Sequence, residues 1–275
     1  FIFLIIKTIK MRLEIELKPQ TRKFLIPINY NFPLSSAIYR IFESFAPNFS
    51  MWLHNEGYQN TDGKRFKFFS FSKLYFEKMQ IDGNMIIAEG NVKFYFTSPL
   101  ADTLIMNFVN GLLTMNNFFL GNNETGVNFK VMKASLLPIP EFSNLMKYKM
   151  LSPTITSIQI IENEKKKIRF LYPDNPEVSN TLAKNLLNKY YILFDRNDAP
   201  NIEIQPDFGY IQKQGGAEKV MKLITIKENA ANQMKVKGFI TPITIKAPVE
   251  IQKVAYYCGL GERNSLGFGC LDVKE

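Results

Sequence analysis

The sequence has only two cysteines and one histidine among its 275 residues. Two cysteines, Cys258 and Cys270, are too few for a disulfide framework or a four-ligand metal site. A single histidine without clustered cysteines also argues against structural zinc. A reduced, cytoplasmic setting is the simpler assumption for such a chain. We therefore expect no metal site and no cofactor.

Long apolar runs are also missing. No segment reaches the roughly 20 apolar residues that a membrane-spanning helix needs. The stretch Phe1–Ile6 is apolar but short, and it lacks the basic segment and cleavage site of a secretory signal. Met11 is a more natural beginning, so residues 1–10 are interpreted as upstream translation or as an extension of the first strand. A basic peripheral-membrane protein would rest on this stretch alone, and we expect no membrane partner.

The usual signatures of nucleotide and metal chemistry are absent as well. There is no Walker A motif and no dinucleotide-binding fingerprint. Two-metal phosphoryl chemistry needs converging carboxylates, whereas Glu162, Glu164 and Asp195 are scattered and are interpreted as solvated loop charges. What the chain does have is an excess of base, with 34 Lys+Arg against 25 Asp+Glu and a net charge of +9. This balance favours an anionic partner, either nucleic acid or a membrane surface, although a basic surface can also be solvated.

The first half shows the order of strands and helices of a ferredoxin-like domain, βαββαβ. Apolar and charged residues alternate in the first strand, and an apolar stripe at helical spacing defines the first helix. A short helical turn over 50–56 follows, with Gly57 as its stop. The expected elements are a strand over 12–18, a helix over 33–45, strands over 64–76 and 85–97, a helix from Ser98, and a strand over 127–137.

The prolines Pro138 and Pro140 and the polar stretch after them indicate a domain boundary. We assign domains to residues 11–138 and 148–275. The second half is interpreted as a decorated copy of the first, which gives an α+β fold of two tandem ferredoxin-like domains. Its expected elements are strands over 154–161, 167–172, 201–205, 220–227, 234–245 and 251–257, and one helix that opens at 175–177.

His54 is the chain's only histidine, and imidazole is a common general acid or base near neutral pH. A lone histidine is more often a surface or packing residue. However, Tyr39 lies fifteen residues upstream on the exposed side of the predicted helix, and Lys64, Arg65 and Lys67 follow. A hydroxyl, an imidazole and a cation are the parts needed for metal-free RNA cleavage. The end of a short helix favours imidazolium, so the sequence leaves open whether His54 acts as acid or base.

Two glycine pairs mark the C-terminal segment, Gly259-Leu260-Gly261 and Gly267-Phe268-Gly269, on either side of Arg263. Successive backbone N–H groups in such a loop can form a cradle for a phosphate, and a tight hairpin is the alternative. The aromatic and basic residues of 64–76 could stack RNA bases, or they could form a buried face that changes phase at a bulge. The basic run Lys165–Arg169 is either a solvated hairpin tip or an RNA contact.

The doubled glycine motif resembles the glycine-rich signature of the CRISPR-associated RAMP proteins. More narrowly, the chain resembles their repeat-processing endoribonucleases, the Cas-six family. The resemblance covers nearly the whole chain from Met11, and it includes Leu53–Tyr58, Leu151-Ser152-Pro153 and Asn185–Tyr190.

The resemblance implies metal-independent cleavage of CRISPR precursor transcripts within the repeat, which leaves a 2′,3′-cyclic phosphate and a 5′-hydroxyl. The family's catalytic histidine corresponds to His54 and its tyrosine to Tyr39. No lysine stands at Gln59 or Asn60, and Lys64 is the nearest candidate for the helper cation. The implied RNA-binding residues are Arg65, Lys67, Gly259, Gly261, Arg263, Gly267 and Gly269.

The implied partners are the CRISPR repeat RNA, as precursor and processed guide, with other effector subunits or a second copy of the chain. The alternative is a RAMP subunit that binds RNA in a CRISPR effector complex without cleaving it.

Overall fold

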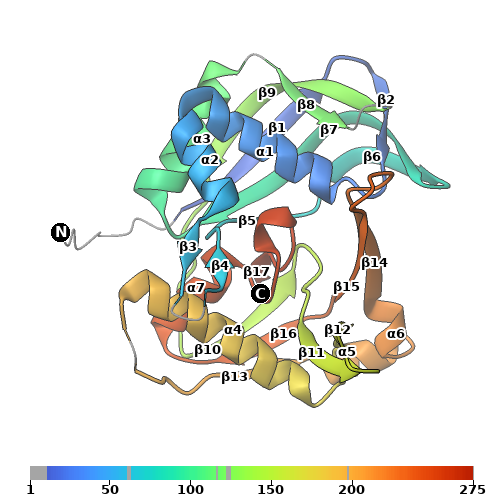
Figure 1. The fold of residues 1–275 in the computed structure, drawn as a ribbon. Helices are drawn as coiled ribbons and strands as arrows, with labels where there is room; N and C mark the ends of the chain where they lie inside the picture. Colours follow the sequence, from blue (N-terminus) through green and yellow to red (C-terminus); the bar gives the residue numbers. More distant parts are fainter. Residues whose placement is uncertain (1–10, 61–62, 116, 122–124, 197, 275) are drawn as a thin grey trace.

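The computed structural model describes residues 11–60, 63–115, 117–121, 125–196 and 198–274. The predicted origin of residues 1–10 lies outside this range. Two mixed α/β units form the molecule, one above the other in Figure 1. Within the described residues, no helix combines the length and the apolar character needed to cross a membrane.

The N-terminal unit has the predicted ferredoxin-like core. Its main strands lie in the order β9-β1-β7-β6 and are antiparallel, with helices α1 and α3 in contact with each other. Three further strands, β2, β5 and β8, complete the sheet. The elements are β1 (Met11–Pro19), β2 (Lys23–Pro27), α1 (Asn31–Phe45), α2 (Pro47–Asn55), β3 (Tyr58–Gln59), β4 (Arg65–Phe66), β5 (Ser70–Phe71), β6 (Tyr75–Asp82), β7 (Met85–Ser98), a π-helical turn (Ala101–Ile105), α3 (Met106–Thr114), β8 (Phe118–Gly121) and β9 (Gly126–Leu136).

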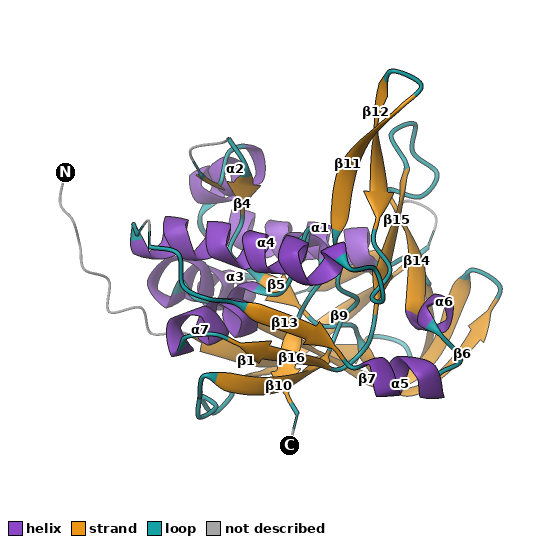
Figure 2. Cartoon of the chain, turned by 90° about the horizontal axis from the view of Figure 1, so that it is seen from below, coloured by secondary structure: helices purple, strands orange, loops and turns teal. Residues whose placement is uncertain are grey.

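The C-terminal unit repeats this plan. Its sheet has the order β13-β16-β10-β17, which is again strand four, one, three, two of a ferredoxin-like domain when read from the far edge. The hairpins β11–β12 and β14–β15 are insertions outside that sheet, and β11–β12 projects from the body in Figure 2. The elements are β10 (Leu145–Met150), β11 (Ser157–Glu162), β12 (Lys165–Phe170), α4 (Glu177–Phe194), β13 (Glu203–Pro206), α5 (Phe208–Lys213), α6 (Ala217–Val220), β14 (Met221–Ile226), β15 (Met234–Phe239), β16 (Ile243–Lys246), α7 (Val249–Cys258), a 3₁₀ turn (Asn264–Leu266) and β17 (Leu271–Val273).

The apolar patterns of the sequence explain the N-terminal core. Leu13, Ile15 and Leu17 of β1 are buried, as the alternation predicts. The stripe of α1 packs against aromatic rings of the core, and the rings of Phe96 and Phe108 stack with centroids 4.1 Å apart. The fold class predicted from the sequence, α+β with two tandem ferredoxin-like domains, is confirmed.

The single strand predicted over 64–76 is wrong. The chain there forms β4, β5 and the start of β6, with Phe68 in a left-handed conformation at φ 51°. This segment crosses to the other domain: the Ser70 hydroxyl donates to the Phe268 carbonyl at 3.1 Å, and the Lys73 amide donates to the Leu151 carbonyl at 3.0 Å. Because these partners lie far away in the sequence, local alternation could not reveal the breaks.

Two predictions in the second half are also wrong. The segment 251–257 is not a strand but most of helix α7, and Ile251, Val254, Ala255 and Cys258 are buried at helical spacing. The run 234–245 is two strands, β15 and β16, because the chain leaves the inserted hairpin and enters the main sheet between them. Helix α7 is the second helix that the βαββαβ plan requires.

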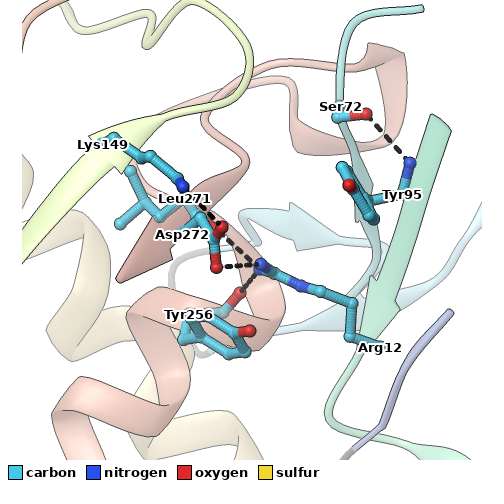
Figure 3. Close-up of polar contacts among 7 residues, drawn as sticks. All are labelled: Arg12, Ser72, Tyr95, Lys149, Tyr256, Leu271 and Asp272. Carbon is cyan, nitrogen blue, oxygen red and sulfur yellow. Dashed lines mark hydrogen bonds and ion pairs between the residues drawn. The ribbon is translucent and has the colours of Figure 1, made fainter. Parts of the chain in front are cut away.

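Arg12 joins the two domains from the first residues of β1. Its side chain is 2% exposed. It donates to Asp272 Oδ1 at 3.2 Å and to the carbonyls of Tyr256 and Leu271. Figure 3 shows these contacts, together with Lys149, which pairs with the other oxygen of Asp272. The guanidinium also lies over the Tyr256 ring at 3.7 Å. These contacts fix β1 of one domain against α7 and β17 of the other.

Candidate functional site

His54 is in the last turn of α2, the short helix that follows α1. Pro47 stands at the start of α2, and Gly57, at φ 65°, follows its end, so the predicted stop is confirmed. Leu53 is fully buried and anchors the helix, whereas His54 is exposed. Its Nδ1 lies 3.0 Å from Asn55 Oδ1. The local sequence therefore presents the imidazole to solvent on a fixed helix end.

Tyr39 lies against His54. The two ring centroids are 5.2 Å apart and the planes meet at 84°, an edge-to-face contact. The Ser50 hydroxyl of α2 donates to the Tyr39 carbonyl at 3.1 Å and ties the two helices together. Burial raises the pKa of Tyr39 well above its usual value, although a hydrogen bond with the Ser265 side chain opposes the shift. Tyr39 therefore carries its proton at neutral pH.

Two of the predicted basic residues hold the end of α2. Arg65 Nη1 donates to the Asn55 carbonyl at 2.7 Å. Lys67 Nζ donates to the His54 carbonyl at 2.9 Å and also to the Leu53 carbonyl. These cations satisfy carbonyls that the helix leaves unpaired and offset its negative end. Burial, helped by the charge of Arg65 and opposed by that of Glu56, lowers the pKa of Lys67 to about 8.

Lys64 keeps its side chain exposed. Its backbone is engaged, since its amide donates to Asn60 Oδ1 at 2.8 Å. This contact closes the turn between β3 and β4, a strand pair that reaches from the upper domain toward α4 in Figure 1. The predicted helper cation thus stands on the rim of the space between the domains.

A cavity of about 480 Å³ occupies this space. One wall carries Lys64, Arg65 and Lys67, and the facing wall comes from α4, the β11–β12 hairpin and the glycine-rich loop, defined here as residues 259–269. Six of the lining residues are cationic: Lys64, Arg65, Lys67, Lys184, Lys189 and Arg263. His54 and Tyr39 do not line the cavity, but helix α1, which carries Tyr39, contacts the lining residue Ser265 through Ser35. The size is within the usual range of ligand sites, and the charge suits a phosphate chain.

The amide cradle expected from the glycine motif does not form at Gly259, Gly267 and Gly269. Their N–H groups donate within the protein to the carbonyls of Ala255, Asn264 and Pro153, at 3.1, 2.9 and 2.8 Å. The pattern instead permits close packing of backbones. A Cβ on Gly261 would lie 2.2 Å from the Ile155 carbonyl oxygen, and one on Gly269 would lie 1.9 Å from that of Leu260.

The glycine-rich loop also packs against helix α1. Ser35 Oγ donates to the Ser265 carbonyl at 2.7 Å, and Asn31 Nδ2 donates to the carbonyls of Leu266 and Gly267 at 3.2 and 3.3 Å. The structure therefore brings the predicted His54, Tyr39, Lys64, Arg65 and Lys67 together at one edge of the cavity. Arg263 lies on its opposite wall.

Lys189 was missed by the sequence reasoning. Its ammonium donates to the carbonyls of Gly259 and Gly261 and to Asn264 Oδ1. A signal existed, because Lys189 falls at helical spacing on the buried face of α4 with Val178, Leu182 and Leu186. No comparable pattern in the sequence marks Ser265 or Arg12.

Two family models that together match most of the chain place it among the CRISPR-associated proteins. Within that class the chain belongs to the Cas6 family. The model of the Cas6 N-terminal region matches residues 25–135, and that of the Cas6 C-terminal region matches residues 137–273.

The similarity to individual Cas6 proteins extends over almost the whole chain. The CRISPR-associated endoribonuclease Cas6 1 of Methanocaldococcus jannaschii is 33% identical over 261 residues, which covers 94% of this chain and 91% of the relative. A putative CRISPR-associated endoribonuclease-like protein Cas6 of Pyrococcus furiosus is 26% identical over 96% of this chain and 99% of its own length. A solved structure of a CRISPR-associated protein Cas6 matches with a TM-score of 0.74 and 29% identity, over 97% of this chain and all of that one.

Proposed function

We propose that this protein is a metal-independent endoribonuclease that binds CRISPR precursor transcripts and cleaves them within the repeat. The observation that carries the proposal is the contact between Tyr39 and the exposed His54 at the edge of the cationic cavity. The name of the 33% identical relative, a CRISPR-associated endoribonuclease, supports the same reaction. An RNA backbone in the cavity would place its phosphates among the lysines and arginines that line it.

The reaction we propose is an attack by the ribose 2′-oxygen on the adjacent phosphorus. The O2′–P bond forms and the P–O5′ bond breaks, so the products are a 2′,3′-cyclic phosphate and a 5′-hydroxyl. His54 takes the proton of the 2′-hydroxyl, and Tyr39 gives a proton to the leaving O5′. Tyr39 suits the acid because its raised pKa keeps the hydroxyl protonated.

The geometry bears on the role of His54. The negative end of α2, which would favour a charged imidazole, is occupied by Arg65 and Lys67. We assign the base to His54 because Tyr39, its partner in the contact, is the proton donor. Lys67 uses two of the three donors of an ammonium on carbonyls. Lys64, whose side chain is exposed, is therefore the cation we assign to the charged phosphorane.

The test uses 5′-labelled CRISPR repeat RNA, incubated with the protein in EDTA. We expect one cut per repeat, a cyclic phosphate on the upstream product, and no cut when the scissile nucleotide is 2′-deoxy. His54→Ala should abolish cleavage, whereas Lys130→Ala, an exposed change on β9, should not. Cleavage that survives His54→Ala would contradict the assignment, and cleavage that requires added metal would contradict the mechanism.

A second candidate function is an RNA-binding RAMP subunit that does not cut. Two observations favour it. Lys67, the cation in contact with the carbonyl of His54, is engaged by helix carbonyls, and Gln59 and Asn60 stand where the family resemblance expects a base. This candidate predicts tight, salt-sensitive binding of repeat RNA with no product at any pH. Size-exclusion chromatography with and without RNA would show whether the protein acts as a monomer, a homodimer or a subunit of a larger complex.

A further inference from the structure

Lys189 of helix α4 is buried at the bottom of the cavity, with an exposed fraction of 2%. Its Nζ lies 2.7 Å from the Gly259 carbonyl oxygen, 2.9 Å from that of Gly261, and 2.7 Å from Asn264 Oδ1. An ammonium has three donors, and all three are used on the glycine-rich loop. Lys189 therefore joins separate parts of this loop through a single buried group.

Asn264 connects Lys189 to the rest of the glycine-rich loop. Its Nδ2 donates to the carbonyls of Leu260 and Phe268 at 3.2 and 3.0 Å. The loop residue next to it, Ser265, contacts helix α1, because its carbonyl accepts from Ser35 Oγ at 2.7 Å. Tyr39 lies one helical turn after Ser35 on the same helix, and the Ser265 side chain acts on it by opposing the rise of its pKa. A connected set of contacts thus runs from Lys189 to the helix that places Tyr39 against His54.

We infer that Lys189 is a positioning residue for the proposed cleavage, because it holds the glycine-rich loop against α1, the helix that places Tyr39 beside His54. This inference rests on the proposed function. Lys189 acts through the loop and not on the Tyr39 or His54 rings, so it is not itself a catalytic residue. Lys189 is one of the six cationic residues that line the cavity. Because its three donors are used on the glycine-rich loop, it is not available to bind an RNA phosphate.

The three acceptors around the side chain of residue 189 explain why a lysine is suited to this position. Two are the backbone carbonyls of Gly259 and Gly261, which no side-chain substitution in the loop can remove. Burial lowers the pKa of Lys189 to about 8, with the Cys258 thiol and the Glu262 carboxylate opposing the shift. The charged form with three donors therefore still predominates at pH 7. Methionine has a similar length but no donor.

The first experiment measures single-turnover cleavage of repeat RNA and RNA affinity for Lys189→Met. We expect the cleavage rate to fall about a hundredfold, the order of loss seen when a catalytic group is displaced by about 1 Å, with RNA affinity unchanged. In a Tyr39→Phe background the same change should have little further effect, because the hydroxyl that Lys189 positions is gone. Equal losses in both backgrounds would overturn the inference.

Gln252→Leu is the matched control. Gln252 is also fully buried, accepts from the Tyr148 hydroxyl, and donates to the carbonyls of Ile245 and Asn144, but none of these partners belongs to the glycine-rich loop. Amide hydrogen exchange at Gly267 and Gly269 should be faster in Lys189→Met than in Gln252→Leu. Equal exchange in the two variants would overturn the inference.

Two outcomes are separated by this design. If the wild type binds repeat RNA without cutting it, the proposed function fails, and the exchange comparison still decides whether Lys189 holds the loop. If Lys189→Met does not fold, Ser265→Ala tests the same path, since it removes only a partly exposed hydroxyl. Ser265→Ala should slow cleavage in the wild-type background and have no further effect in the Tyr39→Phe background. An unchanged rate in the wild-type background would overturn the inference.

Discussion

Gly267→Ala separates the packing role of the glycine-rich loop from a role in RNA contact. Gly267 has φ 78°, a conformation that costs an L-residue about 1–2 kcal/mol. A Cβ there would also lie 2.2 Å from Cε2 of the fully buried Phe71. Forcing extra volume into a packed core costs about 1–3 kcal/mol. We therefore expect Gly267→Ala to lower the free energy of unfolding by about 2–5 kcal/mol.

Urea unfolding, followed by far-UV circular dichroism, measures this loss. The control is Gly83→Ala in the β6–β7 turn, where φ is 57° and nothing lies within 4 Å of the added Cβ. The control should show only the backbone strain, about 1–2 kcal/mol. The difference between the two variants is then the cost of the contact with Phe71.

RNA affinity, measured where both variants are folded, completes the test. Because the Gly267 amide already donates to the Asn264 carbonyl, we expect the affinity of Gly267→Ala to equal that of the wild type. If Gly267→Ala is no less stable than Gly83→Ala, the packing reason is wrong. If its stability is kept and its affinity falls, the glycine-rich loop contacts RNA through its backbone after all.

Three residues, Arg12, Lys67 and Cys270, give further predictions. Arg12→Met leaves Asp272 paired with Lys149 alone and removes the donor of the Tyr256 and Leu271 carbonyls, so it should cost about 1–3 kcal/mol in urea unfolding for each carbonyl left unpaired. Lys93→Met, which removes an exposed pair with Glu14, should cost about 0–1 kcal/mol. Lys67→Met should destabilise the end of α2 by about 1–2 kcal/mol and slow RNA cleavage more than it weakens RNA binding; an unchanged rate would show that Lys67 does not fix His54. Burial raises the pKa of the Cys270 thiol to about 11, so at pH 8 this thiol should resist a disulfide reagent until urea is added, and fast labelling of the native protein would contradict its burial.

Much of the N-terminal domain was predictable because its signals are local. The alternation in β1, the apolar stripe of α1 and the stop at Gly57 each lie within a few residues, and each is confirmed. The error at 251–257 is of a different kind. Helix α7 is buried nearly all round, so its continuous apolar run could equally indicate a buried strand. Only the place of α7 in the βαββαβ plan resolves this ambiguity.

For the candidate site too, some features were visible in the sequence and others depended on the fold. The spacing of Tyr39 and His54 was visible in the sequence, but their contact depends on how α2 turns back on α1 and on the Ser50 bond to the Tyr39 carbonyl. Arg65 and Lys67 were recognised as basic residues near His54. Their bonds to the end of α2 appeared only once the chain had folded back over that helix.

Periodicity, helix stops and residue type are properties of short segments, so the type of fold, the single histidine with its tyrosine, and the glycine motif could all be recognised without coordinates. What those residues do depends on the packing of the two domains. The partners of the glycine-rich loop, Lys189, Asn31 and Ser35, lie more than 60 residues from it along the chain. No local pattern encodes such distant hydrogen bonds. They arise because the carbonyls of the loop need donors, which α1 supplies across the domain junction and α4 supplies from within the C-terminal domain.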